Sequence, residues 1–136
     1  MKWARSLTRL ADYEVETLQK RLAEVVARRV EAEVRLTLLD AEAEAEAENA
    51  RTDSEAALFH PTFVKGWRER RERQCARIEE IAQEEAGARD ALTRAFEEQK
   101  KYEHVVSMAE AAAAKEAGRR ETAALDELGL RAAARR

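Results

Sequence analysis

The chain has 136 residues, of which 39% are charged and 5% are aromatic, and its formal net charge is −3 at pH 7. Alanine, which buries little area, accounts for 29 residues, so the composition excludes a thick globular core and is typical of long helices and coiled coils. The charge balance argues neither for a nucleic-acid-binding protein nor for one that binds a membrane surface, and the single cysteine, Cys75, excludes an intramolecular disulfide.

The N-terminal residues give no sign of a targeting or membrane segment. Lys2 and Arg5 are basic, but Asp12 and Glu14 interrupt the apolar stretch that a secretory signal needs. No apolar run in the sequence is long enough to span a bilayer. These observations predict a soluble, cytoplasmic protein.

Residues 2–58 carry a heptad pattern that predicts a first helical arm. The seam positions, reached by steps of four and three, are Leu18, Leu22, Val25, Arg29, Ala32, Leu36, Leu39, Ala43, Glu46, Ala50, Asp53 and Ala57. Glutamate and alanine alternate in residues 42–48 as in a strand, but both residue types favour a helix. This acidic run is typical of a solvated helix face; the alternative is a surface for a basic partner.

A turn is predicted in the middle of the chain by Pro61, the only proline. Proline lacks the N–H that a helix interior needs, and it disfavours helical conformation in the preceding residue, His60. We therefore expect the first helix to stop near residue 58 and a turn to occupy about 59–62. A second helix then starts with Pro61 itself or after Thr62 as its N-cap.

Residues 63–130 predict a second arm with a seam of its own. The positions are Trp67, Arg71, Gln74, Ile78, Ile81, Glu85, Ala88, Leu92, Phe96, Gln99, Tyr102, Val106, Ala109 and Ala113. Gly87 and Gly118 each lower helix stability by about 1 kcal/mol relative to alanine without ending so long a helix. Beyond Gly118 the pattern loosens, and we expect the helix to fray.

The two seams complement each other if the chain folds back near residue 62. The predicted pairs include Ala57 with Trp67, Asp53 with Arg71, Ala50 with Gln74, Ala43 with Ile81, Leu39 with Glu85 and Val25 with Gln99. Large side chains face small ones in several pairs, and opposite charges meet in one. This matching favours pairing within one chain. We therefore predict an all-α fold with a single domain, 1–136, that forms a long antiparallel two-helix coiled-coil hairpin.

Residues that could carry catalysis or hold a cofactor are sparse. His60 is expected in an exposed turn and His104 on an exposed helix face, and neither shares a predicted pocket with a carboxylate and a nucleophile. The sequence contains no glycine-rich phosphate loop and no zinc-ligand spacing. Cys75 lies beside the seam and is expected to be a small, partly buried side chain. We expect a protein that is not an enzyme and has no catalytic residue, cofactor or metal.

Two regions are candidate interaction surfaces. Phe59, Phe63 and Trp67 flank the predicted turn, where they either close the end of the coil as an apolar cap or dock a partner. Arginines dominate the opposite end, where the two termini are predicted to meet. They are Arg5, Arg9, Arg119, Arg120, Arg131, Arg135 and Arg136. The C-terminal ones favour a helix end through its dipole, or this end is a cationic plug for an acidic hole.

The chain resembles the FliJ-type flagellar export proteins over nearly its whole length. The resemblance rests on the hairpin of alternating charge and on two local patterns. The first is Leu7-Thr8-Arg9-Leu10 leading into Leu18-Gln19-Lys20-Arg21-Leu22-Ala23. The second is Phe96-Glu97-Glu98-Gln99-Lys100-Lys101-Tyr102-Glu103, followed by Glu121 and by Leu125-Asp126-Glu127 with basic residues to the end.

This resemblance implies a cytoplasmic stalk component of the flagellar type III protein export apparatus, at the inner-membrane side of the flagellar basal body. Members of the family insert the end that carries both termini into the hexameric export ATPase and promote its assembly. They also contact the cytoplasmic domain of the export gate and bind export chaperones. The expected ATPase-ring contacts are Arg5, Arg9, Arg131 and Arg135, and the expected docking tip is Phe59, Phe63 and Trp67.

The pairing and charge patterns add the expectation of a monomer that binds no nucleic acid and does not insert into a membrane. Two alternatives stay open at this point. An injectisome-type secretion stalk has the same shape and serves a different export system. A nucleic-acid-binding coiled-coil arm needs a continuous basic stripe and binds in a salt-dependent way. The acidic residues 42–48 argue against this second alternative.

Overall fold

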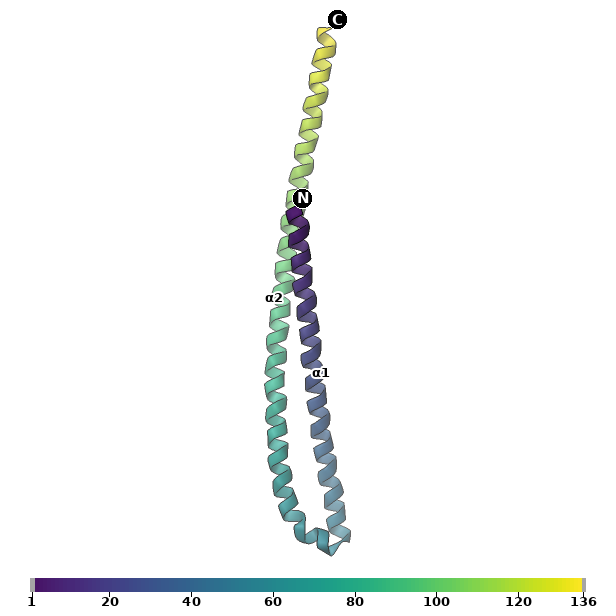
Figure 1. The fold of residues 1–136 in the computed structure, drawn as a ribbon, viewed down its shortest axis with the longest axis vertical. Helices are drawn as coiled ribbons and strands as arrows, with labels where there is room; N and C mark the ends of the chain where they lie inside the picture. The colour runs from purple at the N-terminus through teal and green to yellow at the C-terminus, as the bar shows by residue number, and fades with distance from the viewer. Residues whose placement is uncertain (1, 136) are drawn as a thin grey trace. The chain divides into compact units, whose positions relative to one another are not determined.

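The computed structural model describes residues 2–135, which form two α-helices, α1 (Lys2–Thr52) and α2 (Ser54–Ala134), and no strand. The described residues divide into two compact units, one of residues 16–94 and the other of residues 2–15 together with 95–135. Within each unit a part of α1 packs antiparallel to a part of α2, so the predicted two-helix hairpin is confirmed (Figure 1). Neither helix has, in its described residues, a stretch apolar and long enough to cross a membrane.

A single residue, Asp53, separates the two helices. Its N–H donates to the carbonyl of Asn49 at 2.9 Å, and its own carbonyl accepts a hydrogen bond from the N–H of Ala57 at 3.0 Å. One carboxylate oxygen of Asp53 also accepts a hydrogen bond from the backbone N–H of Glu55 at 2.9 Å. Asp53 therefore ends α1 and caps the first turn of α2, where backbone N–H groups lack helical partners.

The turn predicted at residues 59–62 is wrong, because Pro61 lies inside α2. A proline removes one intrahelical hydrogen bond and crowds the carbonyl four residues before it, which can kink a helix without ending it. Figure 1 shows the first turns of α2 crossing the end of α1 before α2 bends to run beside it. The reversal thus combines a capped break at Asp53 with a bend in the proline-containing start of α2.

The earlier break changes which parts of the two helices face each other. Arg71 pairs with Asp40 instead of Asp53, with 2.9 Å between Nε and Oδ1. Trp67 does not face Ala57; its Nε1–H donates to the carbonyl of Leu39 at 2.8 Å. The predicted pairing is therefore displaced by about two heptads. Because the displacement is close to a whole number of heptads, seam positions still face seam positions.

The core of the 16–94 unit is small and consists of predicted seam residues. Val25, Ala32 and Ile81 are 0%, 5% and 2% exposed and form one cluster, against which the partly buried Ile78 packs. Beside them, Gln74 Nε2 donates to the carbonyl of Ala32 at 2.9 Å across the two helices. The seam therefore alternates apolar layers with polar contacts to the opposite backbone.

The other unit pairs the start of α1 with the middle of α2. Its buried residues are Ala4, Ala11, Val15 and Ala95. Gln99 Nε2 donates to a carboxylate oxygen of Asp12 at 2.8 Å. Every residue from 110 to 135 is exposed, and we call this part of α2 the terminal segment. The segment is helical to Ala134, so the fraying predicted after Gly118 is wrong; alanine and charged residues of high helix propensity favour helix there without packing.

Candidate interaction surfaces

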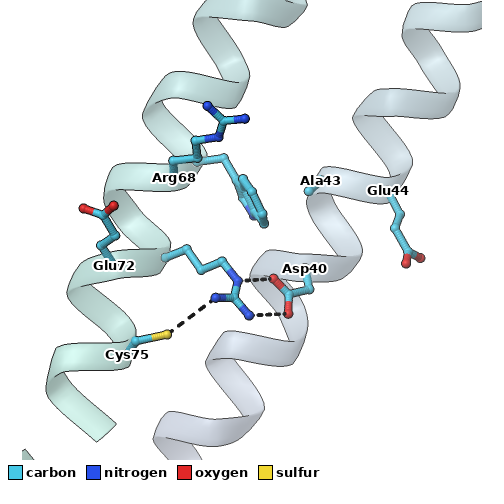
Figure 2. Close-up of a pocket in the computed structure, with 8 residues that line it drawn as sticks. Asp40, Ala43, Glu44, Arg68, Glu72 and Cys75 are labelled. Carbon is cyan, nitrogen blue, oxygen red and sulfur yellow. Dashed lines mark hydrogen bonds and ion pairs between the residues drawn. The ribbon is translucent and has the colours of Figure 1, made fainter. Parts of the chain in front are cut away.

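A groove between α1 and α2 in the 16–94 unit contains most of the polar chemistry near the bend (Figure 2). It is lined by Asp40, Ala43, Glu44, Trp67, Arg68, Arg71, Glu72 and Cys75. Five of these residues come from the part of α2 that the sequence predicted as the start of the second arm. One of them, Trp67, was predicted to belong to the docking tip, so the contacts in this groove show whether its side chain is free to bind a partner.

Arg71 is the centre of this groove. Its guanidinium binds the Asp40 carboxylate through two nitrogens, at 2.9 and 3.5 Å, and lies 6.0 Å from the ring centroid of Trp67. A third nitrogen donates to Cys75 Sγ at 3.7 Å. The hydrogen bond and charge of Asp40, with a smaller contribution from Cys75, raise the pKa of Arg71 above its ordinary value. Arg71 thus stays charged and links the two helices, and Cys75 is half-buried as expected.

The three aromatic residues predicted at the tip lie in different environments. Phe59 is 66% exposed. Phe63 is half-buried; it stacks on His60 with 6.4 Å between ring centroids, and the Arg70 guanidinium lies 6.0 Å from its ring. Trp67 points into the groove, where it bonds across to α1. His60 is a half-buried helical residue and not the exposed turn residue predicted from the sequence. Of the three aromatics, Phe59 offers the largest open apolar surface.

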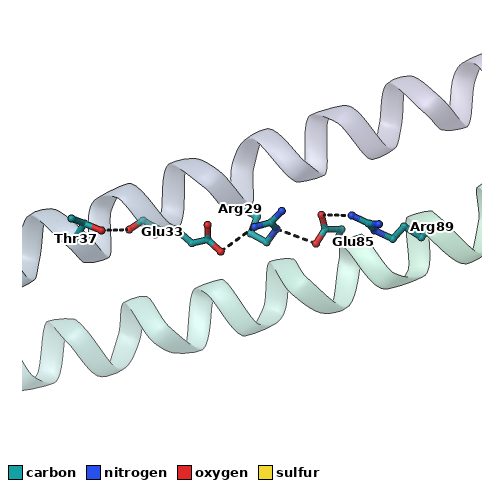
Figure 3. Close-up of polar contacts among 5 residues, drawn as sticks. All are labelled: Arg29, Glu33, Thr37, Glu85 and Arg89. Carbon is teal, nitrogen blue, oxygen red and sulfur yellow. Dashed lines mark hydrogen bonds and ion pairs between the residues drawn. The ribbon is translucent and has the colours of Figure 1, made fainter.

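A chain of charged side chains crosses the seam further along the same unit (Figure 3). Arg29 Nε donates to Glu85 at 3.0 Å, and its Nη1 donates to Glu33 at 3.0 Å. Arg89 Nη2 donates to the other oxygen of Glu85 at 3.2 Å, and the Thr37 hydroxyl donates to the Glu33 carbonyl at 3.1 Å. The Glu85 side chain is only 12% exposed, so this network is shielded more than an ordinary surface pair.

The contacts in this network shift the pKa values of Glu85 and Arg29. Removal from water raises the pKa of Glu85, but the hydrogen bonds and charges of Arg89 and Arg29 outweigh it and hold this pKa below its ordinary value of 4.5. Hydrogen bonds and charges of Glu33 and Glu85 raise the pKa of Arg29. Both shifts favour the charged forms, so the network is intact at neutral pH.

The Glu85 carboxylate should make folding depend on pH. A carboxyl group with a depressed pKa stabilises the fold above its unfolded pKa, and this stabilisation is lost as the pH falls through the folded pKa. We expect the midpoint of urea unfolding to fall between pH 6 and pH 3, as ordinary carboxyl pKa values lie near 4. The fall should be smaller in Glu85→Gln. An equally steep fall in the variant would assign the acid sensitivity to other carboxylates.

One apolar feature was missed by the sequence analysis. Val30, Val34 and Leu38 are 48%, 52% and 62% exposed. They follow one another at steps of four residues, so they form a row along α1 that starts on the side opposite the buried Val25 and Ala32. At its other end, Leu38 lines a groove shared with residues of α2. We call these three residues the outer row. Their spacing is visible in the sequence, but it lies outside the heptad positions that define the predicted seam.

The arginines predicted to gather at one end of the molecule are separated. Arg5 and Arg9 line a shallow pocket together with Val106 and Glu110. Arg131 lies about 37 Å further along the helix from Val106, at a rise of 1.5 Å per residue. The prediction that both termini meet in one basic end is therefore wrong. Its physical cause is the displaced register, which leaves the end of α2 without a partner from α1.

The described end of α2 is basic on its own. Arg131 Nη2 donates to Glu127 at 2.9 Å, one helical turn away, and Arg135 is exposed. No acidic residue follows Glu127 in the sequence, and Arg136 lies outside the described residues. Positive side chains at a helix C-terminus interact favourably with the helix dipole. The basic charge is thus carried by a helix end that has no other packing.

Among residues 2–135, no three His, Cys, Asp or Glu side chains are placed so that they could hold a metal ion together. His104 is exposed on α2, as predicted.

Two long helices that pair antiparallel through apolar layers and cross-helix ion pairs define a coiled-coil hairpin protein. The chain is 55% identical over 133 residues to the flagellar FliJ proteins of two strains of Caulobacter vibrioides, and the match covers 98% of this chain and 96% of each relative. The chain belongs to the flagellar FliJ family, which confirms the resemblance found in its sequence. No family model matches the chain, and no solved structure matches it.

Proposed function

We propose that the protein is a stalk component of the flagellar type III protein export apparatus. It inserts into the hexameric export ATPase, promotes assembly of the hexamer, and links it to the export gate and to export chaperones. It acts as a single chain in the cytoplasm, at the inner-membrane side of the basal body, and catalyses no reaction of its own. The flagellar name of its relatives supports this system over an injectisome.

The observation that carries the insertion role is the terminal segment. Its residues, 110–135, form one helix in which every residue is exposed, so most of its surface is open to a partner within the described part of the chain. The segment ends in Arg131 and Arg135 with no acidic residue beyond Glu127. A basic, unpaired helix end is suited to entering a ring that presents acidic groups. Arg5 and Arg9 belong to the paired part of the molecule and are assigned no ring contact.

The outer row supports the proposed binding to the export gate and to export chaperones. Exposed apolar side chains in a continuous line on a helix favour contact with another apolar surface. Val30, Val34 and Leu38 form such a line, and Phe59 adds a large exposed side chain near the bend. We assign these residues to the export gate or chaperones, and the terminal segment to the export ATPase. Trp67 is not assigned to the docking tip, because its indole N–H donates a hydrogen bond to the Leu39 carbonyl within the fold.

The test uses two charge-reversal variants with the same change in net charge. Arg131→Glu with Arg135→Glu should weaken binding to the purified export ATPase by about tenfold or more, since interfacial charge reversals replace attraction with repulsion. Arg5→Glu with Arg9→Glu is the matched control and should leave binding close to the wild-type value. Surface plasmon resonance measures both affinities. Equal weakening by the two variants would contradict insertion through the terminal segment alone.

A third variant separates the two surfaces. Val34→Glu with Leu38→Glu should abolish binding to the export gate domain or a chaperone while ATPase binding stays unchanged. All variants alter exposed residues, so their circular dichroism spectra should match the wild type. Swimming in soft agar should be reduced by both the Arg131/Arg135 and the Val34/Leu38 changes. Normal swimming of a strain that carries all four substitutions would refute the export role.

A further inference from the structure

The start of α1 has a second line of apolar residues beside its buried seam. Ala4 and Ala11, seven residues apart, are buried where α1 packs on α2. Trp3 and Leu10 each precede one of these alanines, and Leu7 lies between them. Trp3, Leu7 and Leu10 follow one another at steps of four and three residues, which is the spacing of a heptad stripe. This stripe therefore runs along one side of the buried seam.

The middle of α2 has a matching stripe. Ala95 is buried, Tyr102 and Ala109 are half-buried, and these inner positions of α2 recur at steps of seven residues. Val105 lies four residues before Ala109, and Met108 lies one residue before it. On α1, Leu7 and Leu10 have the same two offsets from Ala11. The two helices thus repeat one pattern beside their inner positions.

The two stripes lie on the same side of the hairpin. Arg5 follows Ala4 by one residue, Glu110 follows Ala109 by one residue, and both line one shallow pocket. Residues just after the inner positions of the two helices therefore meet on one side of the seam, so residues just before these positions meet on the other. The pocket also contains Val106, so the two stripes lie at the same height along the helices.

The two stripes together form an apolar surface, which we call the N-terminal patch. Its residues are Trp3, Leu7, Leu10, Val105 and Met108. Leu7 is half-buried, and the other four are between 46% and 65% exposed. A two-helix coiled coil needs one narrow apolar seam, whereas a helix inside a bundle has a wider apolar face. A second heptad stripe on each of two paired helices is therefore suited to cover by a third helix.

Basic side chains lie before and after the patch on α2. Lys101 and Lys115 are exposed, and each is one heptad away from Met108. Residues one heptad apart share a face of the helix, so both lysines lie on the side of the patch. On α1, Lys2 is exposed and adjoins Trp3. A helix that covers the patch would bring its flanking residues close to these positive charges.

The acidic residues of this region lie at the far end of the patch or away from it. Asp12, the first acidic residue of the sequence, accepts a hydrogen bond from Gln99 at 2.8 Å on the opposite side of the seam. Glu98 binds Lys101 at 3.2 Å, and Glu14 follows the last apolar residue of the α1 stripe. The positive character of the patch is therefore strongest where α1 begins.

We propose that the N-terminal patch binds an acidic amphipathic helix of a partner protein, which packs on α1 and α2 as the third helix of a short bundle. Apolar residues of the bound helix recur at heptad spacing over about two heptads, or about 20 Å, and Asp or Glu residues flank them. A helix is favoured over a lipid surface because the patch consists of two parallel heptad stripes, a spacing that lipid does not require. The apolar residues of this site lie outside the terminal segment and the outer row.

The first experiment uses two synthetic peptides as probes. Each has about three heptads with leucine at the a and d positions; the acidic peptide has glutamate at the flanking e and g positions, and the basic peptide has lysine there. Fluorescence anisotropy of the labelled peptides measures their binding to the full chain. The acidic peptide should bind at least about tenfold more tightly than the basic one, because opposite charges attract across the contact. Equal binding of the two peptides, or no binding of the acidic one, overturns the proposal.

Variants of the chain locate the bound peptide. Leu10→Glu with Met108→Glu places two acidic residues in the patch and should weaken binding of the acidic peptide at least about tenfold. Gln19→Glu with Ser107→Glu has the same change in net charge at two exposed residues outside both stripes, and should leave the affinity within about twofold of the wild type. Equal weakening by both pairs would show only a response to net charge and overturns the proposal.

The Val34→Glu and Leu38→Glu pair distinguishes the N-terminal patch from the outer row. This pair should leave binding of the acidic peptide unchanged, because its residues belong to the other compact unit. If it abolishes binding while Leu10→Glu with Met108→Glu does not, the peptide binds at the outer row and the proposal is overturned.

Other occupants of the patch are tested with vesicles and by analytical ultracentrifugation. The chain should not cosediment with phosphatidylglycerol vesicles, and its mass should stay that of a monomer as its concentration rises. Cosedimentation that Leu10→Glu with Met108→Glu abolishes would assign the patch to a lipid surface, and a dimer that the same pair dissociates would assign it to a second copy. Either result overturns the proposal. None of these measurements depends on whether the protein binds the export ATPase.

Discussion

Ile81→Ala is expected to lower the free energy of unfolding by about 2–5 kcal/mol, the usual cost of truncating a buried isoleucine. Ile81 is 2% exposed and packs on Val25 and Ala32, so the truncation leaves a cavity in a cluster of very few buried residues. With so little other core in this unit, few neighbouring side chains can move to fill it. Urea unfolding followed by circular dichroism at 222 nm measures the change.

The control for this prediction is Leu58→Ala, which truncates a large aliphatic side chain that is 78% exposed. Its effect on unfolding should stay within about 0.5 kcal/mol, as for most surface substitutions. Similar losses in Ile81→Ala and Leu58→Ala would mean that the cluster around Ile81 does not hold the hairpin together. It would also favour a solution structure in which Leu58 is buried.

Trp67→Ala is expected to be the second most damaging substitution, with a loss of about 2–4 kcal/mol. The indole is half-buried, lies under the Arg71 guanidinium, and donates a 2.8 Å hydrogen bond to the Leu39 carbonyl. Trp67→Phe keeps most of the apolar contact and loses only the hydrogen bond, which is worth about 1 kcal/mol. The same unfolding experiment separates the two contributions.

Phe59→Ala distinguishes a structural role from a binding role at the predicted tip. Phe59 is 66% exposed, so its truncation should leave stability within about 0.5 kcal/mol of the wild type. If Trp67→Ala left stability unchanged while Phe59→Ala lowered it, the assignment of Trp67 to the fold and Phe59 to a partner would be reversed.

The pattern of buried residues could be predicted from the sequence, whereas the reversal of the chain could not. Val25, Ala32 and Ile81 all lie on the predicted seams, because heptad spacing determines which face of a helix is apolar. The turn was predicted from Pro61, the strongest helix breaker in the chain. The break is at Asp53, where an aspartate followed by serine and glutamate gives a weaker but recognisable N-cap signal.

The register could not be predicted for a related reason. Heptad positions repeat, so pairings that differ by whole heptads satisfy the same apolar pattern. The observed register depends on particular contacts, such as Arg29 with Glu85, whose partners lie 56 residues apart. The sequence predicted that the C-terminal arginines of α2 form a basic group. It did not predict their separation from Arg5 and Arg9, because that separation depends on the register of the two helices. The outer row lies outside the heptad positions of the seam, so the heptad pattern did not predict it.

The terminal segment also differs from the rest of the molecule in width. A lone α-helix with its side chains is about 10–12 Å across, and two helices packed side by side need nearly twice that in one direction. Residues 110–135 can therefore enter an opening that would stop the paired helices.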